Sequence, residues 1–280
     1  MVETVASFRS HGGTQGVYSH ASSSTGTDMT FSVFVPDHAE GARLPVVWYL
    51  SGLTCTHANV TEKGEFRRAC AELGLIFVAP DTSPRGEGVP DDPQGAYDFG
   101  LGAGFYVDAT QAPFDRHYNM WSYVTEELPA LLADHFPVDA ERQSIMGHSM
   151  GGHGALTVGL SFPGRYKAIS ALAPIVAPTQ VPFGIKAFGG YLGNDPAAWR
   201  RHDAVALIED GARAPDILVD QGLADEFLET QLRPELLKAA CDTAAIPLTL
   251  NLREGYGHSY YFISTFMAEH LNWHAERLKA

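Results

Sequence analysis

Short apolar runs recur along most of this chain, and segments with helical spacing of apolar residues follow many of them. Strands that helices cover on both faces carry such runs, because neither face of the strand meets water. The runs predict buried strands at 45–50, 75–79, 143–146, 168–172, 217–220 and 248–252. Apolar spacings of three and four predict helices in the segment ending at 73 and at 120–135, 154–160, 226–240 and 260–278.

The first 43 residues follow a different pattern. Apolar and polar residues alternate over 16–20 and 29–35, and the segment 22–28 between them is rich in turn-forming Ser, Thr, Gly and Asp. This pattern predicts an antiparallel start that leads into a mostly parallel sheet with helices on both faces. The expected fold class is α/β, as a single domain over residues 1–280.

Two long connections lack a sustained period and are rich in Gly and Pro, at about 82–118 and 174–215. A loop of such length inside a compact domain is usually functional, so both are expected to serve as lid or pocket elements. Within the second, only a short helix around 196–201 is predicted. In the predicted helix 120–135, Pro129 is expected to cause a kink or a break.

The segment Gly147-His148-Ser149-Met150-Gly151 fits G-x-S-x-G, the sharp turn between a strand and a helix that exposes a nucleophilic serine. The flanks agree with this reading, since a predicted strand precedes the pattern and a helix rich in small residues follows it. A side chain at either glycine would crowd the turn. Ser149 is therefore the candidate nucleophile.

A serine hydroxyl needs a base within hydrogen-bond reach and a group that orients the base. In the α/β-hydrolase order, acid and then histidine follow the serine. After residue 160 the histidines are His202, His258, His270 and His274. The last two fall on a predicted helix and the first ends a short helix, whereas His258 lies in a glycine-rich loop directly after the last strand. His258 is the expected base.

The acid is expected in the loop after the strand at 217–220, where Asp220, Asp225 and Glu226 compete. Asp220 ends the strand and could satisfy backbone donors there, whereas Asp225 follows a turn that can direct its carboxylate toward the end of the sheet. We prefer Asp225, which would fix the imidazole tautomer and stabilise the imidazolium.

A tetrahedral intermediate requires two hydrogen-bond donors. One is the backbone N–H of Met150, and the loop after strand 45–50 should supply the other, with Leu53 as the best candidate. Cys55 in that loop lacks a base, so it is read as a thiol that lines the pocket. His148 is a further pocket candidate without a catalytic role. The spacing of acidic, Cys and His residues supports no metal site.

Composition narrows the choice of partners. The 280 residues carry a formal net charge of −14 with a pI near 5.2, so attraction to nucleic acid or to an anionic membrane is not expected. No secretory signal is recognised at the N-terminus, and no apolar run approaches the ~18 residues of a membrane span. The three cysteines have no regular spacing, so a reduced, cytoplasmic setting is expected.

Longer strings accompany these residues, at Ser51–Thr56, Ala79–Gly86, Gly102–Thr110, Ser122–Pro129, Gly147–Leu156, Gly190–Gly193 and His258–Ile263. Together they resemble the S-formylglutathione hydrolases, or esterase D family, over about residues 5–278. The resemblance implies an α/β-hydrolase with Ser149, Asp225 and His258 as its triad. It also implies cleavage of S-formylglutathione to formate and glutathione in formaldehyde detoxification, activity on small carboxyl esters, no cofactor, and a cytoplasmic homodimer.

The sequence departs from the family pattern at Ala177, Phe183 and Gly257, where Asn, Trp and Asp are expected. None of these positions belongs to the proposed triad, but each could reach the pocket, and Phe183 is a pocket candidate. The alternatives to a formylglutathione hydrolase are a short-chain carboxylesterase of broad specificity, an acyltransferase and a non-catalytic binding protein.

Overall fold

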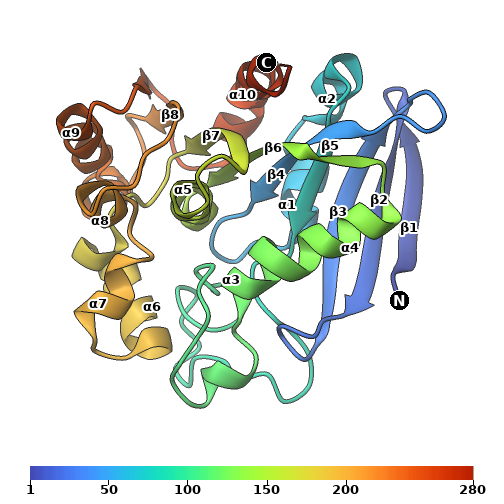
Figure 1. Ribbon diagram of the computed structural model, residues 1–280. Helices are drawn as coiled ribbons and strands as arrows, with labels where there is room; N and C mark the ends of the chain where they lie inside the picture. Colours follow the sequence, from blue (N-terminus) through green and yellow to red (C-terminus); the bar gives the residue numbers. More distant parts are fainter. Residues whose placement is uncertain (280) are drawn as a thin grey trace.

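The protein, described over residues 1–279 by a computed structural model, is built on one nine-stranded sheet (Figure 1). The strand order is β1-β2-β3-β5-β4-β6-β7-β8-β9. The first three strands and β5 pair antiparallel, and every pair from β5 across to β9 is parallel. The strands are Glu3–Ser10, Gly13–Ala21, Asp28–Pro36, Leu44–Leu50, Ile76–Pro80, Val138–His148, Tyr166–Leu172, Ile217–Gly222 and Leu248–Arg253.

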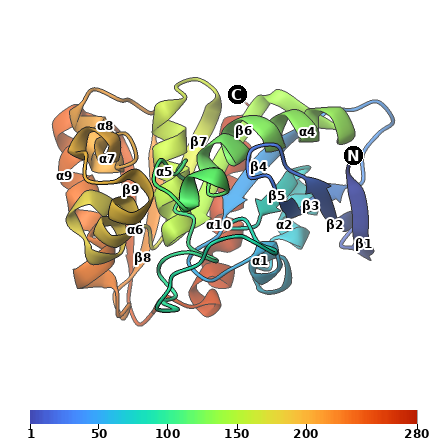
Figure 2. The same cartoon turned by 90° about the horizontal axis from the view of Figure 1, so that it is seen from below.

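Helices cover both faces of this sheet, as the apolar runs predict. Figure 2 shows α1, α2 and α10 on one face and α4 and α5 on the other. The α-helices α1 to α10 are His57–Lys63, Arg67–Leu73, Met120–Ser122, Leu128–His135, Met150–Ser161, Pro182–Leu192, Pro196–Arg200, Ala204–Glu209, Pro234–Ala244 and Tyr260–Leu278. The predicted fold class, α/β with a mostly parallel sheet and an antiparallel start, is confirmed. None of the helices in residues 1–279 combines the length and apolarity needed to cross a bilayer.

The antiparallel start has one strand more than the two predicted, because β1 precedes them. This edge strand is exposed or half-buried at every position. Neither face of β1 is covered by a helix layer, so its sequence has no alternation by which it could be recognised.

The helix expected over 120–135 is continuous but changes its hydrogen-bonding pattern in the middle. A π-helical segment, Tyr123–Glu127, joins α3 to α4. Pro129 lacks a backbone N–H, and its ring would collide with the carbonyl four residues earlier in a regular α-helix. The wider turn before Pro129 avoids that collision, so the predicted kink takes the form of a π segment.

Two helix predictions need correction. The connection 174–215 holds α6 and α8 in addition to the predicted short helix α7. Glycines in Pro182–Leu192 lower its helix propensity, and packing on neighbouring segments overrides that preference. The helix expected over 226–240 is instead a π-helical turn, Leu228–Leu232, followed by α9, because Arg233 adopts a left-handed φ of 51° and Pro234 starts the next helix.

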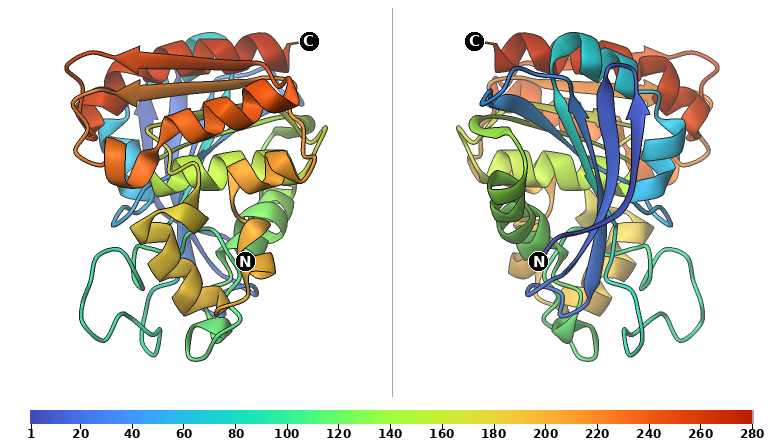
Figure 3. Two further views of the ribbon diagram at one scale, coloured as in Figure 1. Left: turned by 90° about the vertical axis from the view of Figure 1, so that its left-hand side faces the viewer. Right: turned by 90° about the vertical axis from the view of Figure 1, so that its right-hand side faces the viewer.

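The connection from β5 to α3, drawn in teal to green, projects away from the body of the sheet in both views of Figure 3. It leaves from the carboxyl end of a strand, as do the loops after β4, β6, β8 and β9. Because these strands are parallel, all five loops gather at one edge of the sheet, which is where open α/β sheets bind ligands.

Helix α5 contains a histidine that the fold buries in its neutral form. His153 is fully buried, and its Nε2 lies 3.0 Å from the carbonyl oxygen of Phe105, to which it donates. Its Nδ1 has no hydrogen-bond partner among residues 1–279. Burial lowers the pKa of His153 to about 4, because the charged imidazolium would lose its hydration.

This neutral histidine should make stability depend on pH. Unfolding restores a pKa of about 6.5, so His153 contributes fully above that pH and loses its contribution as the pH falls to about 4. The loss from this one group is about 3 kcal/mol, at 1.36 kcal/mol for each of ~2.5 pH units. We expect His153→Gln, which can still donate to Phe105, to flatten the decline in urea-derived unfolding free energy between pH 6.5 and 4.5. His135→Gln, at an exposed position in the last turn of α4, is the control, and equal slopes for the two variants would contradict the expectation.

Candidate active site

Ser149 occupies the turn between β6 and α5 with a backbone conformation that few side-chain-bearing residues adopt. Its φ is 58° and its ψ −119°. A Cβ on Gly151 would come 2.0 Å from the carbonyl oxygen of Leu50, and a Cβ on Gly147 would come 2.1 Å from the carbonyl oxygen of Gly151. Both glycines of the pattern are therefore required by close packing of strand and helix, as the sequence predicts.

A continuous hydrogen-bond chain links the serine to a carboxylate. His258 Nε2 lies 2.8 Å from Ser149 Oγ, and His258 Nδ1 lies 2.6 Å from Asp225 Oδ2. The carboxylate also accepts the backbone N–H of Phe227 at 2.9 Å and the Nε2 of Gln221 at 3.3 Å. Because the Asp225 carboxylate can only accept, the Nδ1 proton stays on His258 and its Nε2 is free to receive the serine proton.

The loops that carry the acid and the histidine are held against each other. Ala224 donates its backbone N–H to the carbonyl oxygen of Tyr256 at 2.9 Å, and a Cβ on Gly222 would come 2.3 Å from that same oxygen. Asp225 has a fully buried side chain, whereas that of His258 is 15 % exposed. The neighbouring acid, Glu226, points into solvent and takes no part.

The competing acid, Asp220, belongs to a separate network. It accepts hydrogen bonds from Asn251 at 2.7 Å and from Arg253 at 2.7 Å, and it lies 3.8 Å from the Nε2 of His270. Burial alone would raise the pKa of Asp220, but these three partners lower it overall. Asp220 therefore joins β8, β9 and α10, and the structure brings Asp225, not Asp220, to His258.

The other late histidines lie away from the serine. His270 and His274 are fully buried and both contact the hydroxyl of Ser170 at 2.8 Å, between β7 and α10. His202 is buried against the ring of Trp121, with centroids 5.1 Å apart. None of these three could serve as the base.

The loop after β4 lies directly against the serine turn. A Cβ on Gly52 would come 3.1 Å from the Cβ of Ser149, and Cys55 donates its N–H to the Gly52 carbonyl oxygen at 3.3 Å, which closes a tight turn. The N–H of Leu53, inside this turn, has no acceptor among residues 1–279. Met150 begins α5, where the first N–H groups have no partner in the helix. Both predicted donors are thus available beside Ser149.

A cavity of about 200 Å³ opens at the serine. Its walls include the three predicted pocket residues, Cys55, His148 and Phe183. The remaining lining residues are Gly52, Leu53, Thr54, Tyr97, Ser149, Phe227, Leu232 and His258. Each long connection provides an aromatic residue, Tyr97 from the first and Phe183 from the second, with ring centroids 6.0 Å apart.

Sequence reasoning missed Tyr97, Phe227 and Leu232. The edge of the Phe227 ring contacts the His258 ring, with centroids 5.0 Å apart. Phe227 follows Asp225 by two residues, so its position next to the predicted acid could have identified it as a residue of the cavity. Tyr97 lies in a loop without any period, so no sequence pattern could have directed it to the cavity.

The two polar candidates in the cavity are held uncharged by their surroundings. Burial raises the pKa of the Cys55 thiol, which leaves little thiolate at neutral pH. Burial, with a smaller effect from His258, lowers the pKa of His148 well below its usual value. The rings of His148 and His258 lie 4.5 Å apart, so a neutral His148 avoids repelling an imidazolium on His258. Among residues 1–279 no cluster of His, Cys, Asp or Glu could hold a metal ion.

Two of the departures from the family pattern lie at or beside the cavity. Phe183 lies in its wall, with its N–H bound to Gln231 Oε1 at 3.0 Å. A Cβ on Gly257 would meet only the Ala224 carbonyl oxygen, at an ordinary 3.6 Å, so a side chain would fit beside His258. Ala177 is fully buried and does not line the cavity.

A matched pair of substitutions tests the choice of acid. Asp225→Asn should lower kcat by ~10³ to 10⁴, because the amide can hold the imidazole in the wrong tautomer. Asp220→Asn should keep kcat within about threefold while lowering the melting temperature, since it weakens the link to Arg253. The comparison uses kcat of folded protein, checked by circular dichroism. The assignment of the acid is wrong if Asp220→Asn loses activity and Asp225→Asn keeps it.

Comparison with known proteins places this geometry in a family. A family model named Esterase, described as "Putative esterase", matches residues 22–273. A solved S-formylglutathione hydrolase from Agrobacterium tumefaciens superposes with a TM-score of 0.96 at 58 % identity, covering 98 % of this chain and 99 % of that one. A ferulic acid esterase superposes with a TM-score of 0.74 at 17 % identity, covering 96 % of this chain and 100 % of that one, which supports the fold alone.

Curated relatives agree over the full length. The S-formylglutathione hydrolase of Paracoccus denitrificans is 52 % identical over 276 residues, covering 99 % of this chain and 98 % of its own. That of Mus musculus is 48 % identical over 282 residues, covering 100 % and 99 %. With the serine, histidine and carboxylate joined at the edge of an α/β sheet, these matches confirm the predicted resemblance: the chain belongs to the S-formylglutathione hydrolase family of esterases.

Proposed function

We propose that this enzyme hydrolyses S-formylglutathione to formate and glutathione, with Ser149 as nucleophile. The observation that carries the proposal is the hydrogen-bonded chain Asp225–His258–Ser149, with contacts of 2.6 and 2.8 Å, in which Ser149 and His258 line a small cavity. The relatives that share about half of its residues over the full length carry this activity in their names. The proposed substrate therefore rests on membership of the family, and the proposed mechanism rests on the geometry of the three residues.

The reaction runs in two halves. Ser149 Oγ attacks the formyl carbon while His258 Nε2 takes its proton, and the carbonyl oxygen becomes an oxyanion bound by the N–H groups of Leu53 and Met150. The carbon–sulfur bond then breaks, glutathione leaves with the proton from His258, and a formyl ester remains on Ser149. Water attacks this ester as His258 accepts its proton, formate leaves, and Ser149 recovers its hydrogen. Asp225 stabilises the imidazolium in both halves.

The size of the cavity favours a short acyl group. About 200 Å³ is below the usual range for drug-sized ligands, and its lining is largely apolar with Phe183, Phe227 and Leu232. A formyl group needs little of this volume, and the glutathione sulfur would lie toward the opening. The neutral state of Cys55 supports the choice of Ser149 as the nucleophile.

Further parts of the proposal follow from the family resemblance. We propose a single-domain, cytoplasmic homodimer that acts without a cofactor, with neither nucleic acid nor membrane as a partner, in formaldehyde detoxification. The acidic net charge of −14 is consistent with the absence of nucleic acid, and the free, buried Cys55, Cys70 and Cys241 fit a reducing compartment.

The substrate assignment is tested by comparing kcat/KM for S-formylglutathione with that for 4-nitrophenyl acetate. We expect the thioester to be preferred by at least ~100-fold, since the good thiolate leaving group and the small acyl group both suit this site. Ser149→Ala should abolish both activities. A clear preference for the acetate ester would instead favour the broad carboxylesterase, and unchanged hydrolysis by Ser149→Ala would rule out Ser149 as nucleophile. Formyl transfer to added methanol in preference to water would indicate an acyltransferase.

Phe183 should limit the acyl group. Phe183→Ala is expected to raise kcat/KM for 4-nitrophenyl butyrate by roughly tenfold relative to the acetate ester, because it removes a ring from the cavity wall. Phe183→Trp should shift the ratio in the opposite direction. Phe162→Ala, which removes a half-buried ring packed on Trp121 away from the cavity, is the control and should leave the ratio unchanged. An unchanged ratio in both Phe183 variants would show that this wall does not select the acyl chain.

A further inference from the structure

The turn that presents the Leu53 N–H contains a strained residue. Gly52 to Cys55 form a tight turn closed by the Cys55 N–H, and its third residue, Thr54, has a φ of 66°. A turn with positive φ at this position normally carries Gly or Asn there. A β-branched residue is unfavourable in that conformation, so the turn needs restraint from its surroundings.

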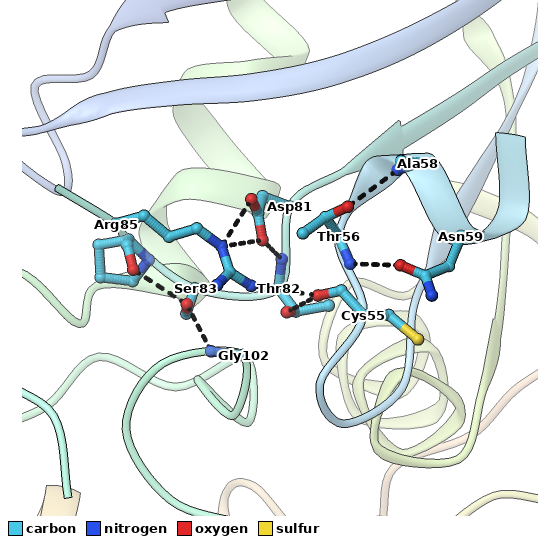
Figure 4. A network of polar contacts seen from close by, with 10 residues as sticks. Cys55, Thr56, Ala58, Asn59, Asp81, Thr82, Ser83, Arg85 and Gly102 are labelled. Carbon is cyan, nitrogen blue, oxygen red and sulfur yellow. Dashed lines mark hydrogen bonds and ion pairs between the residues drawn. The ribbon is translucent and has the colours of Figure 1, made fainter. Parts of the chain in front are cut away.

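The restraint comes from the segment that follows β5 (Figure 4). The carbonyl oxygen of Cys55 accepts hydrogen bonds from Thr82 Oγ1 at 2.5 Å and from Arg85 Nη2 at 3.4 Å. On the other side of the turn, Thr54 donates its N–H to the carbonyl oxygen of Gly102 at 2.9 Å. The connection 82–118 therefore holds the peptide group directly before the strained residue, through the Thr54 N–H, and the peptide group after Cys55, through its carbonyl oxygen.

These partners are themselves fixed. Arg85 Nε lies 3.2 and 3.0 Å from the two carboxylate oxygens of Asp81, and Asp81 Oδ1 also accepts the N–H of Thr82 at 2.6 Å. Gly102 donates its N–H to Ser83 Oγ at 2.8 Å. Asp81, Thr82, Ser83 and Arg85 come directly after β5, so the end of one strand braces the loop that leaves its parallel neighbour, β4.

We propose that Arg85, through the carbonyl oxygen of Cys55, is a positioning residue that keeps the strained turn in the form that directs the Leu53 N–H at the oxyanion. Arg85 does not line the cavity, and its side chain is 37 % exposed. Its partner Asp81 is only 8 % exposed, so loss of Arg85 should also lower the melting temperature. A positioning role predicts a further effect on the transition state in the folded enzyme, and this inference rests on the proposed hydrolysis at Ser149.

The first test is Arg85→Met, which keeps the side-chain length and removes the donors. With 4-nitrophenyl acetate we expect kcat to fall by roughly ten- to a hundredfold with KM within about twofold, because a small misplacement of one donor is costly. The inhibition constant of ethylboronic acid, which forms a tetrahedral adduct with serine, should rise by a similar factor. Arg142→Met is the control. The side chain of Arg142 is 41 % exposed and also pairs with an aspartate, Asp139, but it lies away from the site. It should change none of these values.

The second test is a double-mutant cycle with Thr54→Gly. Glycine adopts the positive φ without strain, so Thr54→Gly should restore at least half of the logarithmic loss in kcat caused by Arg85→Met. A structural role in the folding of 82–118 alone would give no such rescue. The inference is overturned if Arg85→Met keeps wild-type kcat, if its loss appears in KM alone, or if Thr54→Gly fails to rescue it. Inactive wild-type enzyme would instead refute the proposed hydrolysis itself.

Discussion

The close approach of strand β6 to helix α5 at Ser149 is the constraint on which the rest of the site depends. A Cβ on Gly147 of β6 would come 2.1 Å from the carbonyl oxygen of Gly151 in α5, and a Cβ on Gly151 would come 2.0 Å from that of Leu50 at the end of β4, so strands and helix can meet only without these side chains. The packing forces Ser149 into a positive φ and places its hydroxyl at the carboxyl edge of the sheet. It also brings the N-terminus of α5, with its free N–H groups, beside the same hydroxyl.

The remaining groups reach Ser149 because neighbouring strands deliver their loops to the same edge. β8 and β9 pair in parallel, so the loops with Asp225 and His258 leave the sheet side by side, and Asp220 stabilises this pair of strands through Asn251 and Arg253. The loop after β4 is braced in the same way by the segment after β5. Strand pairing, supported by polar contacts behind the site, thus brings together the loops that carry the reacting groups.

The regular parts of the fold could be predicted from the sequence, because burial on two faces leaves an apolar run and an amphipathic helix leaves a period of 3.6 residues. The last helix, expected from 260 to 278, begins and ends at those residues. The prediction failed for elements whose burial leaves no apolar pattern in the sequence or whose composition disfavours the structure that they adopt. Strand β1 is exposed on both faces, and α6 is held by packing in spite of its glycines.

The sequence by itself determined the elbow, the order of serine, acid and histidine, and the loops that carry them, since each depends on local sterics or on the alternation of strands and helices. Only the tertiary structure decided between Asp220 and Asp225, because both follow the same strand and differ only in which partners the folded chain brings to them. It also decided that Tyr97 lines the cavity and that Arg85 braces the Cys55 carbonyl. Contacts between segments distant in sequence have no signature in either segment alone.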